Sequence, residues 1–127
     1  MFDHDPEVLA AFAEESAVRI SSLEKGLLEL EREPATPSTN LLNAVFRDAH
    51  SVKAGANLLG LRQVETAAHR LENVLDMLRS GRLSAEPEVC QSLLDGVDLL
   101  REILEAPQSA RNIEADHRLT ALANLTT

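Results

Sequence analysis

The sequence predicts an all-α fold, an antiparallel up-and-down four-helix bundle. Leucine and alanine carry most of the apolar content of the 127-residue chain, and aromatic residues make up only 2% of it. Such a composition favours helix over sheet. Apolar residues recur at steps of three and four along four segments that proline or glycine separates, and no segment alternates as a strand would. The length fits a single domain, expected over residues 1–127.

The first predicted helix spans residues 6–32. Asp5 is its expected N-cap, and Pro6 suits the first turn because the N–H that proline lacks has no partner there. Pro34 and Pro37 end this helix, since proline cannot continue one. Its apolar side chains follow the helical period, and they are Val8, Phe12, Ile20, Leu23, Leu27 and Leu30.

The second predicted helix spans residues 39–59. Ser38 has the side chain of an N-cap, and Gly60 ends the helix or marks a tight turn within a residue or two of its end. The apolar seam steps 3, 4, 3, 4, 3 through Leu42, Val45, Ala49, Val52, Ala56 and Leu59.

The third predicted helix spans residues 62–80 and is followed by Gly81. The link from the second helix is so short that the two helices must lie antiparallel. The buried stripe of the third helix is expected to contain Val64, Ala67 or Ala68, Leu71, Leu75 and Leu78.

The fourth predicted helix spans residues 86–106, with Pro87 in its first turn and Pro107 after its end. A weaker periodic segment allows a short fifth helix over residues 112–124. The apolar residues of the fourth helix form a stripe wide enough for a bundle core, and they are Val89, Leu93, Leu94, Val97, Leu100, Ile103 and Leu104.

Charge and composition exclude several classes of function. The chain has 12 basic and 21 acidic residues and a formal net charge of −9, so we expect no nucleic-acid partner. No apolar run approaches the roughly 20 residues that span a bilayer, and the N-terminus is acidic where a secretory signal is basic. We therefore expect a cytoplasmic protein without a membrane segment. Cys90, the one cysteine, is expected to be a small buried apolar residue.

One strip of the second predicted helix carries the residues of most chemical interest. At 3.6 residues per turn, it runs beside the apolar seam rather than within it, so His50 is expected to be partly exposed. Lys53 leans toward the same patch, and Ala54 and Gly55 leave little bulk in the way of an approaching partner. The strip contains Asn43, Arg47, His50, Ala54 and Asn57.

His50 has the surroundings that a phosphate-carrying imidazole needs. One neutral ring nitrogen must face solvent while the other donates its proton to a fixed acceptor, and a cation such as Lys53 helps to hold the phosphoryl oxygens. If the second and third helices turn near residue 61, His50 lies 11 residues before the turn and Glu72 lies 11 after it. The two then sit at matching height. Glu72 belongs to a polar strip with Glu65, His69 and Asp76.

These residues resemble a known family. The segment AHSVKAGANLLG at 49–60, followed by HRLENVLDMLRSG at 69–81, is similar to histidine phosphotransfer (HPt) domains, in particular the N-terminal domain of chemotaxis histidine kinases of the CheA type. The family pattern is His-Ser-apolar-Lys-Gly, a second glycine, and His-x-x-Glu-Asn on the next helix. The matching residues are His50, Ser51, Val52, Lys53, Gly60, His69, Glu72 and Asn73.

The resemblance implies a role for each matching side chain. His50 accepts the phosphoryl group, Glu72 hydrogen-bonds the other ring nitrogen, and Lys53 and His69 tune the site. The family usually has glycine directly after the lysine, where this chain has Ala54, and this departure bears on the geometry of docking. Partner docking is expected on Arg47, Ala54, Gly55 and Asn57.

The resemblance also implies the partners. They are a histidine-kinase ATP-binding domain, in cis or in trans, and the receiver domain of a response regulator, whose aspartate takes the phosphoryl group. No cofactor is expected in this domain, because ATP and Mg²⁺ belong to the partner modules. The domain alone is not expected to be an independent enzyme but the phosphoacceptor part of a sensor histidine kinase, either as a fragment of a larger kinase or as a free-standing protein.

Two other classes of function remain open from the residues alone. The first is a metal site that joins His50, His69 and Glu72, although di-metal bundles use Glu-x-x-His on two helices and this chain has one His-x-x-Glu in the reverse order. The second is an adaptor bundle in which the strip is merely solvated. His4 and His117 have no suggestive neighbours in the sequence and are interpreted as ordinary surface residues.

Overall fold

The computed structural model describes residues 5–33, 37–106 and 111–127, and these residues form helices and no strand. Pro34, Pro107 and His4 lie outside them, so the two predicted helix stops and the interpretation of His4 are not addressed. The elements in chain order are α1 (Pro6–Arg32), α2 (Thr39–Leu59), α3 (Arg62–Arg79), α4 (Pro87–Glu105), the 3₁₀ helix η1 (Ile113–Ala115) and α5 (His117–Leu125).

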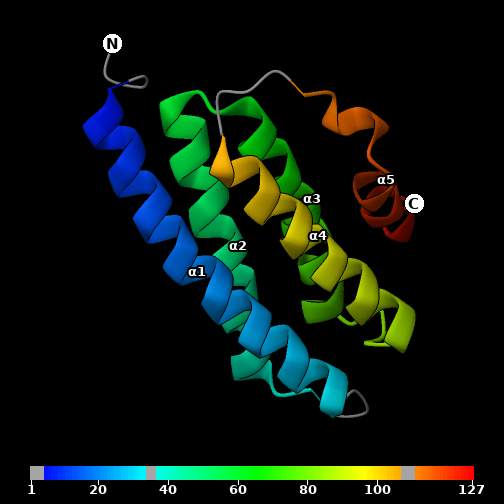
Figure 1. Cartoon of the computed structure of the whole chain (residues 1–127). Helices are drawn as coiled ribbons and strands as arrows, with labels where there is room; N and C mark the ends of the chain where they lie inside the picture. The colour runs from blue at the N-terminus through cyan, green and yellow to red at the C-terminus, as the bar shows by residue number, and fades with distance from the viewer. Residues whose placement is uncertain (1–4, 34–36, 107–110) are drawn as a thin grey trace.

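The first four helices pack in a ring and run alternately up and down (Figure 1). Each contacts the next along the chain, and α1 closes the ring against α4. The predicted four-helix bundle is therefore confirmed. The fifth helix lies outside the ring, against α3 and α4.

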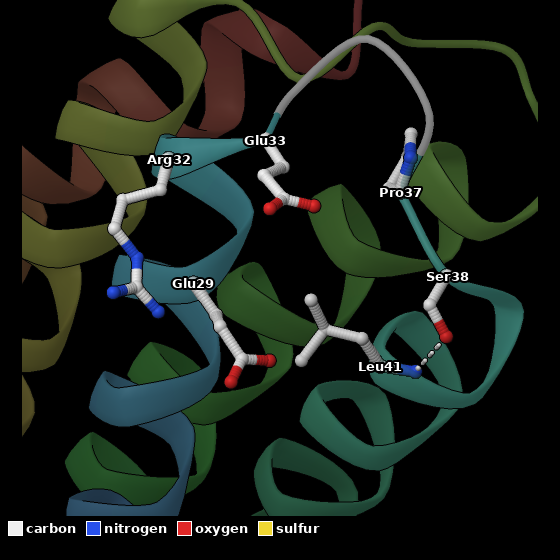
Figure 2. Close-up of a pocket in the computed structure, with 6 residues that line it drawn as sticks. All are labelled: Glu29, Arg32, Glu33, Pro37, Ser38 and Leu41. Carbon is white, nitrogen blue, oxygen red and sulfur yellow. Dashed lines mark hydrogen bonds between the residues drawn. The ribbon is translucent and has the colours of Figure 1, made fainter.

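Local capping explains where the first two helices begin. The Asp5 carboxylate accepts a hydrogen bond from the backbone N–H of Glu7 at 2.8 Å, and Ser38 Oγ accepts one from the N–H of Leu41 at 3.2 Å (Figure 2). Such caps satisfy N–H groups that have no partner within the helix. Gly60 ends α2 with φ 70° and ψ 24°, a left-handed conformation that glycine adopts without steric cost.

Three predicted boundaries differ slightly from the structure. The third helix ends at Arg79 rather than at residue 80. The fourth spans Pro87–Glu105 rather than 86–106, because Glu86 has the extended backbone of an N-cap.

The largest difference is in the predicted fifth helix over 112–124, which is divided in two. Asp116 interrupts it, since its carboxylate caps α5 by accepting from the N–H of Arg118 at 2.9 Å. The Arg118 guanidinium also donates to both oxygens of Glu102 on α4. These contacts join α5 to the bundle.

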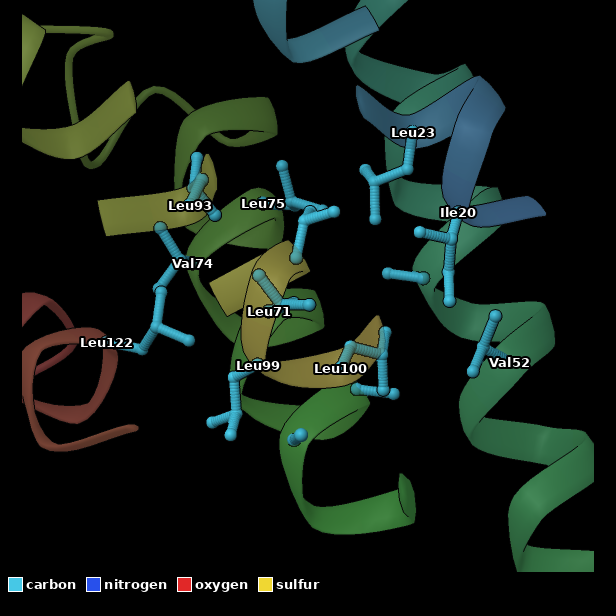
Figure 3. Close-up of a cluster of buried hydrophobic side chains, with 14 of the residues drawn as sticks. Ile20, Leu23, Val52, Leu71, Val74, Leu75, Leu93, Leu99, Leu100 and Leu122 are labelled. Atoms are coloured by element: carbon cyan, nitrogen blue, oxygen red, sulfur yellow. The ribbon is translucent and has the colours of Figure 1, made fainter. Parts of the chain in front are cut away.

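The core is built almost entirely from aliphatic side chains of all five α-helices (Figure 3). Burying one leucine contributes about 1.5–3 kcal/mol. The predicted stripes of α2 and α3 are buried throughout, whereas Val8, Phe12, Leu94 and Leu104 are only partly buried. Cys90 is buried as expected, and within the described ranges no helix is long and apolar enough to cross a membrane.

Candidate functional site

His50 projects from the middle of α2 on the side away from the core. Ala49, one residue before it, and Val52, two residues after it, are fully buried and anchor that part of the helix. The His50 side chain itself is 54% exposed. The imidazole is therefore held by a rigid helix and still accessible to a partner, as the helical period predicts.

Glu72 on α3 orients the ring. Nδ1 of His50 lies 2.5 Å from Oε2 of Glu72, whose side chain is only 9% exposed. Since the carboxylate is an acceptor, Nδ1 carries the proton in this bond and Nε2 is left with its lone pair. The sequence predicted this pairing but treated Glu72 as part of a surface strip, whereas the structure buries it.

The height match comes from the antiparallel hairpin of α2 and α3. A second hydrogen bond, from Asn57 Nδ2 to Glu65 Oε2 at 2.6 Å, also joins these helices. Both pairs are centred on residue 61, the position of the predicted turn. The Asn57–Glu65 pair lies closer to the turn and shows the same register of the two helices.

Lys53 has a partner in the structure that the sequence did not predict. Its Nζ donates to Oε1 of Glu72 at 2.7 Å, so it contacts the carboxylate that orients His50 rather than standing free beside the imidazole. Burial raises the pKa of Glu72, but the hydrogen bonds from Lys53 and His50 outweigh this effect, and the net pKa lies below its ordinary value of 4.5. The carboxylate is thus ionised at neutral pH and shared between the two side chains.

The remaining predicted site residues are distributed over the surrounding surface. Arg47, Ala54 and Asn57 are exposed on the side of α2 that carries His50. His69 is also exposed, and its side chain makes no hydrogen bond to a described residue. Gly55 differs from the prediction, because it faces α1.

Gly55 is packed against Phe12 of α1. A Cβ atom at this position would lie 2.8 Å from Cε1 of the Phe12 ring, which is closer than van der Waals contact allows. The glycine therefore allows α1 and α2 to approach closely. It is not part of the docking surface around His50, contrary to the prediction. Ala54, at the position where the family usually has glycine, is exposed and has room for its methyl group.

Sequence reasoning missed Phe46, which contacts the imidazole, and Arg79, which contacts Phe46. The rings of Phe46 and His50 are stacked, with centroids 6.0 Å apart and an interplanar angle of 15°. The guanidinium carbon of Arg79 on α3 lies 3.8 Å from the centroid of the Phe46 ring. Phe46 precedes His50 by four residues, a spacing that places side chains in contact on a helix, and this was the available signal.

The geometry bears on two other kinds of site. Among the described residues, no group of three or more His, Cys, Asp or Glu side chains is arranged to hold a metal ion. The hollow of about 230 Å³ in Figure 2 lies between the end of α1 and the start of α2 and is lined by Glu29, Arg32, Glu33, Pro37, Ser38 and Leu41. Leu41 precedes His50 by nine residues, about 14 Å along the helix, so this hollow is separate from the histidine.

Fold and site together define a class of protein: a helical bundle that presents a carboxylate-oriented imidazole on the surface of one helix. A family model described as the Hpt domain matches residues 7–123. The chain belongs to the Hpt domain family.

Similar proteins and structures agree with this assignment. The chain is 36% identical to the chemotaxis protein CheA of Rhizobium meliloti (strain 1021), in a match that covers 93% of this chain and 16% of that protein. The phosphorylated P1 domain of CheA3 from R. sphaeroides, crystallised in complex with CheY6, matches with a TM-score of 0.81 at 25% identity, covering 93% of this chain and 94% of that one.

The CheA phosphotransferase domain from Thermotoga maritima matches with a TM-score of 0.73 at 29% identity, covering 81% of this chain and 96% of that one. The chain thus spans nearly the whole of these solved domains. It spans only about 16% of the length of the first curated relatives.

Proposed function

We propose that this domain is a phosphoryl carrier in a chemotaxis-type signalling relay, with His50 as the phosphoacceptor. The observation that carries the proposal is the hydrogen bond between Nδ1 of His50 and buried Glu72. It leaves Nε2 as the nucleophilic nitrogen of a side chain that is half exposed.

The chemistry at His50 requires only a small change in the imidazole. The Nε2 lone pair attacks the terminal phosphorus of a nucleoside triphosphate held by the kinase module, the N–P bond forms, and the P–O bond to the leaving nucleoside diphosphate breaks. The positive charge that develops on the ring is stabilised by Glu72, which holds or accepts the Nδ1 proton. In the second step a carboxylate of the receiver attacks the phosphorus, and the electron pair of the N–P bond returns to Nε2.

Lys53 acts in this scheme through Glu72. By donating to Oε1 it keeps the carboxylate ionised and aimed, so that Oε2 remains available to His50. His69 is retained as a secondary residue only, since its side chain is exposed and not bonded to the pair within the described residues.

The partners belong to the proposal as well. The phosphoryl donor is a histidine-kinase ATP-binding domain, in cis or in trans, and the acceptor is a response-regulator receiver domain. Two observations support them: curated relatives of this chain include chemotaxis CheA proteins, and one similar solved domain is phosphorylated and complexed with CheY6. We place the docking surface on Arg47, Ala54 and Asn57 around the imidazole, and the relay in the cytoplasm.

ATP and Mg²⁺ are assigned to the partner modules, and this domain is a substrate and donor rather than an independent enzyme. Its contribution is an oriented nucleophile on a rigid helix.

The direct test is replacement of His50. The chain is incubated with radiolabelled ATP and a CheA-type catalytic core, and label that is acid-labile and base-stable is counted on unaltered protein, His50→Gln and the control His117→Gln. His117 is exposed on α5, so the control makes the same substitution outside the site. Label on the unaltered chain and on His117→Gln, and none on a folded His50→Gln, is expected. Retained label on His50→Gln would refute the proposal.

A further inference from the structure

The imidazole of His50 is held by more than its hydrogen bond to Glu72. A histidine ring can still rotate about the bond that joins it to the side chain, because that torsion has a broad energy profile. A bond to Nδ1 restrains one ring atom. A surface against the ring face is needed to restrain its plane.

Phe46 supplies that surface. Its ring lies one helical turn before His50 and is nearly parallel to the imidazole, at 15° and 6.0 Å between centroids. This separation lies in the range of offset aromatic stacking. Phe46 is only partly buried, so contacts outside the core also help to fix its position.

Arg79 supplies the second support from α3. Its guanidinium carbon is 3.8 Å from the Phe46 centroid, well within the distance for a cation–π contact. The guanidinium is in turn held by Asp76, whose Oδ1 accepts from Nη2 at 2.9 Å. A chain of contacts therefore runs from Asp76 through Arg79 and Phe46 to the imidazole.

We infer that Phe46 and Arg79 are positioning residues that fix the plane of the His50 ring and so keep Nε2 aimed away from α3 during phosphoryl transfer. The inference rests on the proposed function of His50 and deepens it. Neither residue contacts the reacting atoms, and both act through the imidazole.

The chain offers a matched control for Arg79. Arg82 also approaches Asp76, with Nη2 3.7 Å from Oδ2, but it has no aromatic contact among the described residues. Arg79→Gln and Arg82→Gln therefore remove the same charge from the same neighbourhood, and only the first removes the contact with Phe46. For the ring itself, Phe46→Leu removes the aromatic face and Phe46→Tyr retains it.

The experiment measures the initial rate of phosphorylation of the chain by phosphoramidate, a small donor that transfers its phosphoryl group and releases ammonia. No protein partner is involved, so effects on docking do not enter. We expect Arg79→Gln to be about two- to fivefold slower than Arg82→Gln and Phe46→Leu about two- to tenfold slower than Phe46→Tyr. Thermal midpoints of each pair are compared to confirm that all variants are folded.

A second measurement distinguishes positioning from general structural damage. The ¹⁵N chemical shifts of His50 report the fraction of the neutral ring with its proton on Nδ1 and the lone pair on Nε2. That fraction is expected to fall in Arg79→Gln and Phe46→Leu and to be unchanged in Arg82→Gln and Phe46→Tyr. Equal rates and equal ¹⁵N shifts within both pairs would overturn the inference.

The proposed function and the inference fail in different ways. Absence of label on His50 in the unaltered chain would contradict the proposed carrier role, whereas the ¹⁵N comparison still decides whether Phe46 and Arg79 position the ring.

Discussion

Replacing Glu72 with glutamine changes the site by one atom and removes its charge. The carboxylate accepts two hydrogen bonds, from His50 at 2.5 Å and from Lys53 at 2.7 Å. Glutamine has the same shape, but its amide has one acceptor oxygen and one NH₂ donor. It cannot accept from both side chains on two separate oxygens.

The size of the effect follows from the bond that is lost. Hydrogen bonds with a charged partner contribute about 1.5–3 kcal/mol, and a change of about 1.4 kcal/mol in a barrier alters the rate tenfold. We expect Glu72→Gln to be phosphorylated about 10- to 100-fold more slowly. If the amide NH₂ faces the ring, Nδ1 becomes an acceptor, the proton moves to Nε2, and the nucleophilic lone pair is lost.

The assay is the initial rate of ³²P transfer from ATP through a saturating CheA-type catalytic core. Glu65→Gln is the control, because it makes the same substitution in another hydrogen bond between α2 and α3, that of Asn57 and Glu65 at 2.6 Å. Circular dichroism confirms that both variants are folded. If the rates of Glu72→Gln and Glu65→Gln agree within twofold, Glu72 does not orient the imidazole and our interpretation of the site is wrong.

Three further predictions concern stability and docking. Leu71→Ala is expected to lower the free energy of unfolding, measured by urea denaturation, by about 2–5 kcal/mol, because Leu71 is fully buried. The control Leu58→Ala, at a residue that is 73% exposed, should change this free energy by less than about 0.5 kcal/mol. Similar values for the two variants would mean that the helix faces are misassigned. Ala54→Gly restores the usual family residue at an exposed helical position and should cost about 1 kcal/mol of stability. For the same variant, a changed rate of phosphotransfer to a receiver would place Ala54 in the interface, whereas an unchanged rate would show that the methyl group does not affect docking. Arg118 lowers the pKa of Asp116 from 3.8 to about 2, so the ionised carboxylate stabilises the fold above pH about 4, and about 1 kcal/mol of that stability should be lost as the pH falls toward 2. Asp116→Asn keeps a capping side chain but should lack this part of the pH dependence when the unfolding midpoint is measured in acid titrations. A pH profile identical to that of the unaltered chain would contradict the assignment.

The fold was largely predictable because helices follow local rules. The spacing of apolar residues gives the buried face of each helix, and cap residues such as Asp5 and Ser38 mark where helices begin. The short link at Gly60 forces the hairpin of α2 and α3. The exception is the division of the fifth helix at Asp116, which depends on whether this carboxylate caps a helix or lies within one. Its hydrogen bond with Arg118 on α5 decides this, and Arg118 is in turn held by Glu102 on α4.

The pairing of His50 with Glu72 was predictable for the same reason. Two antiparallel helices that turn at a known residue bring equidistant positions to one height, so the register could be counted along the chain. The angular position of His50 on its helix also follows from the period of 3.6 residues, and its exposed fraction of 54% agrees with it.

By itself, then, the sequence determined the helices, their faces, their antiparallel order and the height of the histidine relative to its acceptor. The tertiary structure alone decided the burial of Glu72, the partner of Lys53, the contact of Gly55 with Phe12 and the stacking of Arg79 on Phe46. The physical reason is that helical periodicity gives the direction of a side chain from its own axis. What it meets there depends on how closely the neighbouring helix approaches and on the rotamers that packing leaves available.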